Sequence, residues 1–141
     1  MNNKLLIDQA LPFAKSDKKT RLMGEFCNFC ADFLPIENDF TIQIVSEREP
    51  YGISTTAAYH IGENKCIIYA KNRAFVDVLR SIAHEMTHMM QDELGLIRGK
   101  IRDEGGFHED QANARAGEII KRFAKSKDGR KAIYEQLSIY A

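Results

Sequence analysis

Hydrophobic residues recur at helical spacing most clearly between Ala74 and Leu94, a stretch of 21 residues without Gly or Pro. The recurring positions are Phe75, Val78, Leu79, Ile82, Met86, Met89 and Met90. Intervals of three and four place such residues on one side of a helix. The pattern predicts a long helix that is apolar around most of its circumference before residue 84, and therefore central in the fold.

Three further segments have helical patterns. Residues 3–14 predict a short amphipathic helix that ends near Ser16. A second helix is expected over about 17–34, with Ser16 or Asp17 as its N-cap. A third begins at Phe107. The apolar positions are Leu22, Phe26, Phe29, Cys30 and Phe33 in the second helix, and Ala112, Ala116, Ile119, Ile120 and Phe123 in the third.

The segment between the second helix and the central one has the pattern of strands. Phe40–Val45 alternates as a half-buried strand does. Ile53–Ile61 and Cys66–Ala70 are joined by four polar residues beginning with Gly62, which favours an antiparallel hairpin. We therefore expect an α+β fold in one domain, 1–141, with N-terminal helices in 1–36 and a small antiparallel sheet packed on the central helix in 37–141.

Charge excludes several classes of partner. Twenty basic and twenty acidic residues give zero net charge, so no overall field attracts nucleic acid or a membrane surface. The first residues lack the apolar run of a secretory signal, and no stretch approaches the roughly 20 apolar residues of a membrane span. Together with three cysteines, which cannot all pair with one another, this predicts a cytoplasmic protein.

Cys27 and Cys30 have the spacing C-x-x-C, which occurs in redox centres and zinc sites. The pair lies in the middle of a helical pattern, and no second C-x-x-C follows it in the sequence. Redox pairs of this kind normally open a helix after a strand. We interpret the two residues as small buried side chains.

Within the central helix, residues 84–88 read His-Glu-Met-Thr-His, the pattern H-E-x-x-H. His84 and His88 are one turn apart on one face, so both imidazoles can bind one metal ion. Glu85 is rotated by about 100° from His84 and lies beside the open position of the metal, where a general base is needed. The plainer interpretation is that both histidines are ordinary polar positions on a half-buried helix.

A hydrolytic zinc site takes three protein ligands and one water. Glu109, 21 residues after His88 and near the start of the next predicted helix, is the preferred third ligand. Asn113, one turn later, could hydrogen-bond a ligand imidazole. His108 is the main alternative, and Asp103 and Glu104 are less firmly held. The metzincin pattern is excluded because it requires Gly at position 91 and His at position 94, where this chain has Gln and Leu.

The motifs HEMTH and EDQAN together resemble the gluzincin metallopeptidases, most closely the IrrE/ImmA group. The wider pattern is also similar to small metallopeptidase-like proteins of tailed phages, and the resemblance covers roughly residues 53–123. It implies a minimal zincin domain with one Zn²⁺ per chain, held by His84, His88 and Glu109, with Glu85 as catalytic base. Asn113 stands where thermolysin has Asp, so it would orient a histidine without adding negative charge.

This resemblance implies hydrolysis of a protein or peptide substrate, and the similarity to phage proteins implies a bacterial host. The expected substrate position is along the exposed edge of the strand 53–61, which is rich in Ser, Thr and Ala. Tyr59, His60 and His108 are candidate donors to the oxyanion, and each is also interpretable as an ordinary polar or packing residue. The sequence identifies neither the peptide nor the oligomeric state.

Two other functions remain open from the sequence. The chain could be a zinc-containing interaction module without turnover, although a closed structural site has no use for Glu85. Residues 121–131 contain six basic residues against one acidic residue and could contact phosphate, but a solvated helix end explains them equally well. SprT-like proteases combine H-E-x-x-H with DNA association; their third ligand is a histidine, which would point to His108.

Overall fold

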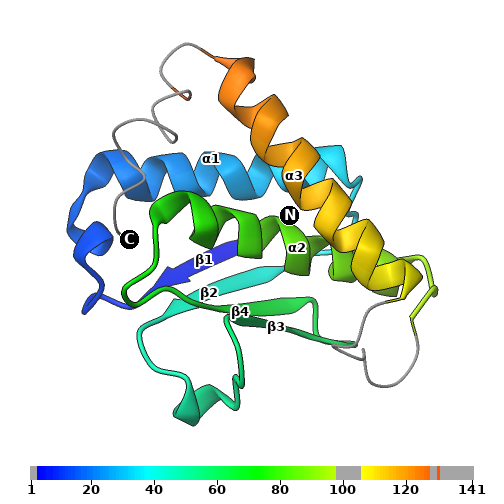
Figure 1. The fold of residues 1–141 in the computed structure, drawn as a ribbon, viewed down its shortest axis with the longest axis horizontal. Helices are drawn as coiled ribbons and strands as arrows, with labels where there is room; N and C mark the ends of the chain where they lie inside the picture. Colours follow the sequence, from blue (N-terminus) through cyan, green and yellow to red (C-terminus); the bar gives the residue numbers. More distant parts are fainter. Residues whose placement is uncertain (1–2, 98–105, 128–129, 131–141) are drawn as a thin grey trace.

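The computed structural model describes residues 3–97, 106–127 and 130. In chain order the strands and α-helices are β1 (Lys4–Ile7), α1 (Asp17–Phe33), β2 (Thr41–Val45), β3 (Ala57–His60), β4 (Lys65–Tyr69), α2 (Phe75–Glu93) and α3 (Phe107–Ser126). Short 3-10 helices occupy Pro12–Lys15 and Glu49–Tyr51. The predicted α+β class is confirmed, and Figure 1 shows α1 and α2 on the same side of the sheet.

The four strands form one sheet in the order β1-β2-β4-β3. The expected antiparallel hairpin is present, with Tyr59 opposite Cys66 in β3 and β4. However, β1 and β4 both run parallel to β2, so the prediction of an antiparallel sheet was wrong and the sheet is mixed. The physical reason is that α1 connects β1 to β2 as a crossover, which returns the chain in the same direction.

The N-terminal segment differs most from its prediction. Residues 4–7 form an edge strand and residues 12–15 a 3-10 helix, where one amphipathic helix was expected. Leu5, Leu6 and Ile7 are too short a run to distinguish helix from strand, and their conformation comes from pairing with β2, far away in sequence. The strand predicted over 53–61 is also shorter, because only Ala57–His60 pairs with β4.

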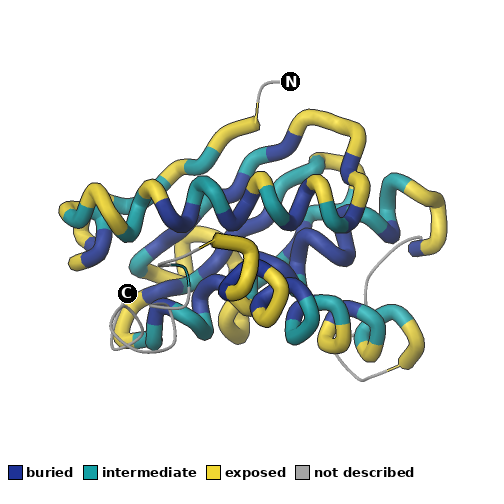
Figure 2. Tube along the Cα trace, turned by 90° about the horizontal axis from the view of Figure 1, so that it is seen from above, coloured by how far each residue is buried: buried dark blue, intermediate teal, exposed yellow. Residues whose placement is uncertain are grey.

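The three long helices are where the sequence predicts them. Ser16 caps α1, and its side-chain oxygen accepts from the amide of Lys19 at 3.3 Å. The buried positions of each helix face inward, and Figure 2 shows them alternating with exposed positions along the tube. Cys27 and Cys30 are both buried in the core, as expected, and burial raises the pKa of both thiols.

The main core lies between one sheet face and the helices. Ile42 and Ile44 of β2 pack there with Ile82 and Met86 of α2. A smaller cluster, Val45, Ile53 and Ile67, covers part of the other sheet face. In the described ranges, no helix is both long enough and apolar enough to span a membrane.

Candidate metal centre

Helix α2 presents one polar face to an open cleft. Ser81, His84, Glu85 and His88 all line this cleft, and they follow one another at helical spacing. Most apolar side chains of α2 are buried against the sheet, α1 and α3. The H-E-x-x-H residues are therefore held on a helix that cannot rotate without exposing its core residues.

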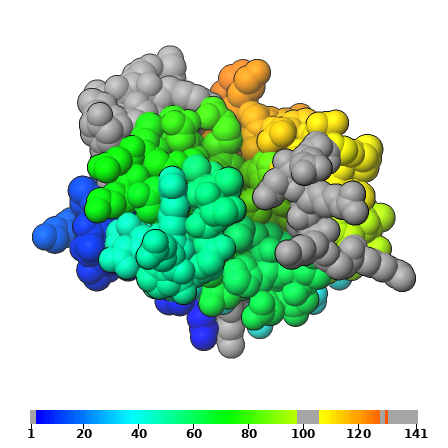
Figure 3. Space-filling view, turned by 60° about the horizontal axis from the view of Figure 1, so that its bottom comes forward, coloured from blue at the N-terminus to red at the C-terminus, as the bar shows by residue number. Residues whose placement is uncertain are grey.

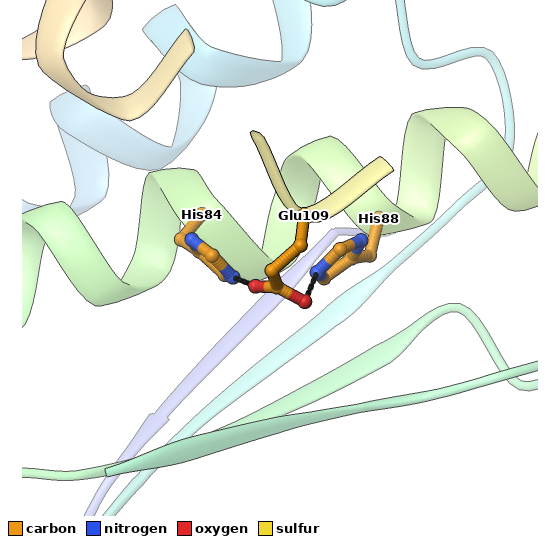
Figure 4. A group of neighbouring side chains, drawn as sticks. All are labelled: His84, His88 and Glu109. Carbon is orange, nitrogen blue, oxygen red and sulfur yellow. Dashed lines mark ion pairs between the residues drawn. The ribbon is translucent and has the colours of Figure 1, made fainter. Parts of the chain in front are cut away.

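Glu109, in the first turn of α3, lies between the two histidines (Figure 4). One carboxylate oxygen contacts His84 Nε2, and the other lies 3.4 Å from His88 Nε2. One potential ligand atom from each of the three residues can be chosen so that all lie within 4.8 Å of one another. The sequence prediction that these three side chains converge agrees with the structure.

The arrangement fits a catalytic type of zinc site. Ligand atoms about 2.1 Å from a tetrahedral ion are roughly 3.4 Å apart, so small side-chain rotations suffice to bring the three donors onto one ion. The set His-His-Glu suits zinc, and three protein ligands leave a fourth position for water. The open side faces the cleft that His84, Glu85 and Glu109 line.

His88 is the buried member of the cluster, with only 3% of its side chain exposed. Its Nδ1 is 2.8 Å from Oε1 of Gln91, which is fully buried. Because the Gln91 oxygen only accepts, this contact keeps the proton on Nδ1 and leaves Nε2 free to bind a metal. Gln91 Nε2 in turn donates to the His108 carbonyl at 3.0 Å and to Gln111 Oε1 at 2.9 Å. The network ties the histidine to the helix that carries Glu109.

His84 occupies the open side, with 19% of its side chain exposed. Burial lowers the pKa of His84, the Glu109 carboxylate opposes this, and the neighbouring His88 adds to the lowering. A hydrogen bond with Asn113 also acts on His84, as the sequence predicted for that residue. The lowered pKa favours the neutral imidazole, which is the form that binds metal.

The cleft extends well beyond the metal cluster and has a volume of about 850 Å³. One wall is α2, and the opposite wall is formed by residues 52–59 and 61. Arg73 and Asp77 line the end near the start of α2, whereas Glu109 and Asn113 contribute from α3. Figure 3 shows the segments that form these walls meeting on one face of the molecule.

The three candidate oxyanion donors have different surroundings. Tyr59 lines the cleft, but its hydroxyl donates to Asp92 Oδ2 at 2.5 Å; burial and this hydrogen bond raise the pKa of Tyr59. His60 is not among the residues that line the cleft and pairs with Glu63 at 3.3 Å. His108 is outside the ligand cluster, and its buried Nδ1 has no hydrogen-bond partner among the described residues. Of the three, only Tyr59 lines the cleft, and its hydroxyl is bonded to Asp92.

Two residues of the site escaped prediction. In the sequence, Gln91 served only to exclude the metzincin pattern. In the structure it fixes the tautomer of His88. Its spacing of i+3 from His88 was the available signal. Arg73, at the far end of the cleft, precedes α2 and has no motif that would have singled it out. The alternative ligands Asp103 and Glu104 lie outside the described residues.

No family model matches the chain, and no curated protein matches its sequence. The chain is similar in structure to Wss1. A crystal structure of a Wss1 mutant from Saccharomyces cerevisiae has a TM-score of 0.55 at 9% identity, over 88% of this chain and 94% of that chain. A second Wss1 structure from the same organism has a TM-score of 0.55 at 12% identity, over 85% and 91%.

At this level of identity the likeness to Wss1 shows the fold alone. The likeness extends over most of the chain, beyond residues 53–123, to which the resemblance of the motifs is confined. The closer resemblance to the IrrE/ImmA group and to phage proteins finds no support in these comparisons and stays a prediction.

Proposed function

We propose that this protein is a zinc-dependent peptidase in which His84, His88 and Glu109 hold one Zn²⁺ and Glu85 is the general base. The observation that carries the proposal is the convergence of three metal-binding side chains at a cleft that is also lined by Glu85. A structural zinc site would be closed by a fourth ligand. Among the described residues the cluster has three members, and it borders a cleft of about 850 Å³.

Zinc held by His84, His88 and Glu109 would supply a Lewis acid that polarises a peptide carbonyl and activates water near neutral pH. Glu85 would take a proton from the attacking water and deliver it to the leaving nitrogen. Glu85 is 9% exposed as a residue and lines the cleft, so it lies at the boundary between the core and the cleft. Gln91 holds His88 in the tautomer that leaves Nε2 available to a metal.

The edge of β3 offers a backbone template for the substrate. Thr56 accepts from the amide of Tyr69 at 2.9 Å, so alternation along the antiparallel pair also turns the hydrogen-bonding groups of Ala58 toward β4. Those of Ala57 and Tyr59 consequently point toward the other edge, with which no other described strand pairs. We propose that an extended peptide adds to this edge and passes the metal centre.

Wss1 is a zinc metalloprotease of the SprT-like type, which supports a peptidase but makes the third ligand a point to test. The histidine alternative, His108, is adjacent to Glu109, and only Glu109 joins the cluster. We propose a protein or peptide substrate, and the cytoplasmic location and phage origin remain predictions from the sequence. Neither nucleic acid nor a membrane enters the proposal.

The test compares metal content and casein hydrolysis in wild type, Glu109→Ala, His108→Ala and Glu85→Gln. We expect about one zinc per chain in wild type and near loss of zinc in Glu109→Ala, because two histidines alone bind weakly. Glu85→Gln should keep its zinc and lose about 10²- to 10⁴-fold in hydrolysis. His108→Ala serves as the matched control, since it removes a neighbouring side chain of the same turn.

Retention of zinc by Glu109→Ala together with its loss from His108→Ala would overturn the ligand assignment. Wild type that holds zinc without hydrolysing casein or denatured protein mixtures would favour a zinc-containing interaction module instead. Loss of zinc from Glu85→Gln would show that Glu85 acts as a ligand and not as a base.

A further inference from the structure

Arg73 is a half-buried cation on the wall of the cleft, in the connection between β4 and α2. Its guanidinium is fixed by three hydrogen bonds. Nη1 donates to the Tyr69 carbonyl at 2.7 Å, and Nη2 donates to the Asp77 carbonyl at 3.1 Å and to Ser81 Oγ at 2.7 Å. All three acceptors are neutral oxygens, so the bonds orient the charge without neutralising it.

The carboxylate that acts on Arg73 is that of Asp77, and it already forms an ion pair with another arginine. Asp77 Oδ1 pairs with Arg80 at 2.8 Å, and the ion pairs of the described residues include none made by Arg73. Burial is the main cause that lowers the pKa of Arg73, and the charge of Asp77 opposes it. Arg48, which stacks over the ring of Tyr69, lowers the pKa of Arg73 further. A partly desolvated guanidinium without a counterion gains free energy when an anion binds.

Arg73 also retains donors for such an anion. An arginine has five N–H groups, and three are used by the bonds described above, which leaves two among the described residues. The two that remain, one on Nε and one on Nη1, are not parallel, and each can donate one charge-assisted hydrogen bond to a carboxylate oxygen. Arg80 of α2 also lines the cleft, but its guanidinium is paired with Asp77, whereas Arg73 makes no ion pair among the described residues.

The distance to the metal centre is set by α2. Ser81 precedes His84 by three residues, which is about 4.5 Å along the helix axis. The Arg73 guanidinium lies beyond Ser81 on the side away from His84 and contacts its hydroxyl. An extended peptide advances about 3.3 Å per residue. A peptide chain along β3 would therefore bring the second or third residue from the scissile bond to Arg73.

We propose that Arg73 is a specificity-determining residue and that the cleft selects peptides with an acidic side chain, Asp or Glu, two or three residues to one side of the bond at the metal centre. This inference rests on the proposed function, since it concerns the substrate of the same site. It adds a chemical class of substrate that the metal ligands do not specify.

The test measures binding separately from hydrolysis. Zinc-loaded Glu85→Gln protein is immobilised and exposed at low salt to a pool of random octapeptides, and the retained peptides are sequenced. We expect Asp and Glu to be enriched about five- to tenfold at one position relative to the input pool. The enrichment should be absent from Glu85→Gln/Arg73→Gln, which keeps hydrogen-bonding capacity and loses the charge, and should reverse toward Lys and Arg in Glu85→Gln/Arg73→Glu.

Arg115→Glu in the same Glu85→Gln background is the matched control, because it makes the same change of charge at an arginine on α3 that pairs with Glu118 and does not line the cleft. It should keep the acidic enrichment. Thermal melting and zinc content verify that each variant is folded and loaded.

Retained peptides no more acidic than the input, equal enrichment in the Arg73→Gln background, or no retention at all would overturn the proposal. The wild-type enzyme is then given the same pool. Acidic enrichment on the inactive protein without cleavage by wild type would overturn the peptidase function but not the role of Arg73 in binding. Failure of the proposed function can therefore be distinguished from failure of this inference.

Discussion

His84 and His88 belong to one motif, yet they lie in different environments. His88 is buried, and its second nitrogen is bound to Gln91, whose amide reaches across to α3. His84 faces the cleft, where exposed Asn113 is its polar neighbour. The buried side fixes the geometry of the site, and the open side meets the substrate. One helix can serve both purposes because residues four apart share a face but not the same depth.

The largest expected difference between the two sides is in the stability of the metal-free protein. His88→Ala should lower the free energy of unfolding by about 2–3 kcal/mol, because it leaves a cavity and an unpaired buried Gln91 oxygen. His84→Ala should cost less than about 1 kcal/mol, since its site is partly open. Urea unfolding in the presence of a chelator measures both, and equal costs would contradict the distinction.

Removal of the metal tests whether both histidines bind the same ion. Chelation should lower the melting temperature of wild type, because zinc binds the folded site and not the unfolded chain. The effect should vanish in both His84→Ala and His88→Ala, as each leaves only two ligands. Calorimetric melting with and without chelator provides the measurement. A persistent zinc-dependent shift in His84→Ala would place the ion elsewhere.

Gln91→Leu removes the buried hydrogen bonds while approximately keeping side-chain volume. We expect a loss of about 1–3 kcal/mol in stability, because His88 Nδ1 and the carbonyl of His108 lose a buried partner. Zinc affinity should fall by about 10- to 100-fold, since the tautomer of His88 is no longer fixed. Competition with a chromophoric chelator gives the affinity. Unchanged affinity would show that the metal alone orients the imidazole.

Asn113→Ala is the corresponding change on the open side. Because Asn113 is exposed, water can replace its amide beside His84, and zinc affinity should fall by less than about tenfold. Stability should stay within about 0.5 kcal/mol of wild type. The same chelator competition measures this variant beside Gln91→Leu, and a loss as large as that of Gln91→Leu would reverse the proposed ranking of the two sides.

The smallest effect is expected for Tyr59→Phe, on the sheet wall of the cleft. The Tyr59 hydroxyl donates its hydrogen bond to Asp92, so removal of the hydroxyl should change kcat by less than about threefold. Steady-state hydrolysis of a peptide found in the wild-type screen provides the rate. A fall of 10²-fold or more would mean that the hydroxyl leaves Asp92 and stabilises the oxyanion during the reaction.

The sequence by itself determined the three long helices, the hairpin of β3 and β4, and the motif residues of the centre. These features depend on local spacing: 3.6-residue periodicity defines α1, α2 and α3, and positions four apart on α2 bring His84 and His88 to one face. The meeting with Glu109 was predicted from the chemistry of a three-ligand site, and the packing of α3 on α2 provides it.

The strand β1 and the roles of Gln91 and Arg73 depend on tertiary contacts. Residues 4–7 form β1 because β2 is available for parallel pairing, and such a non-local contact leaves no periodic signal in four residues. Gln91 and Arg73 acquired their positions in the same way. One is a polar residue placed between two helices, and the other a cation placed in a cleft between α2 and the sheet. The hydrogen bonds of Gln91 to α3, and the strand segment that shares the cleft with Arg73, come from distant parts of the chain, so only local contacts such as that of Gln91 with His88 left a signal in the sequence.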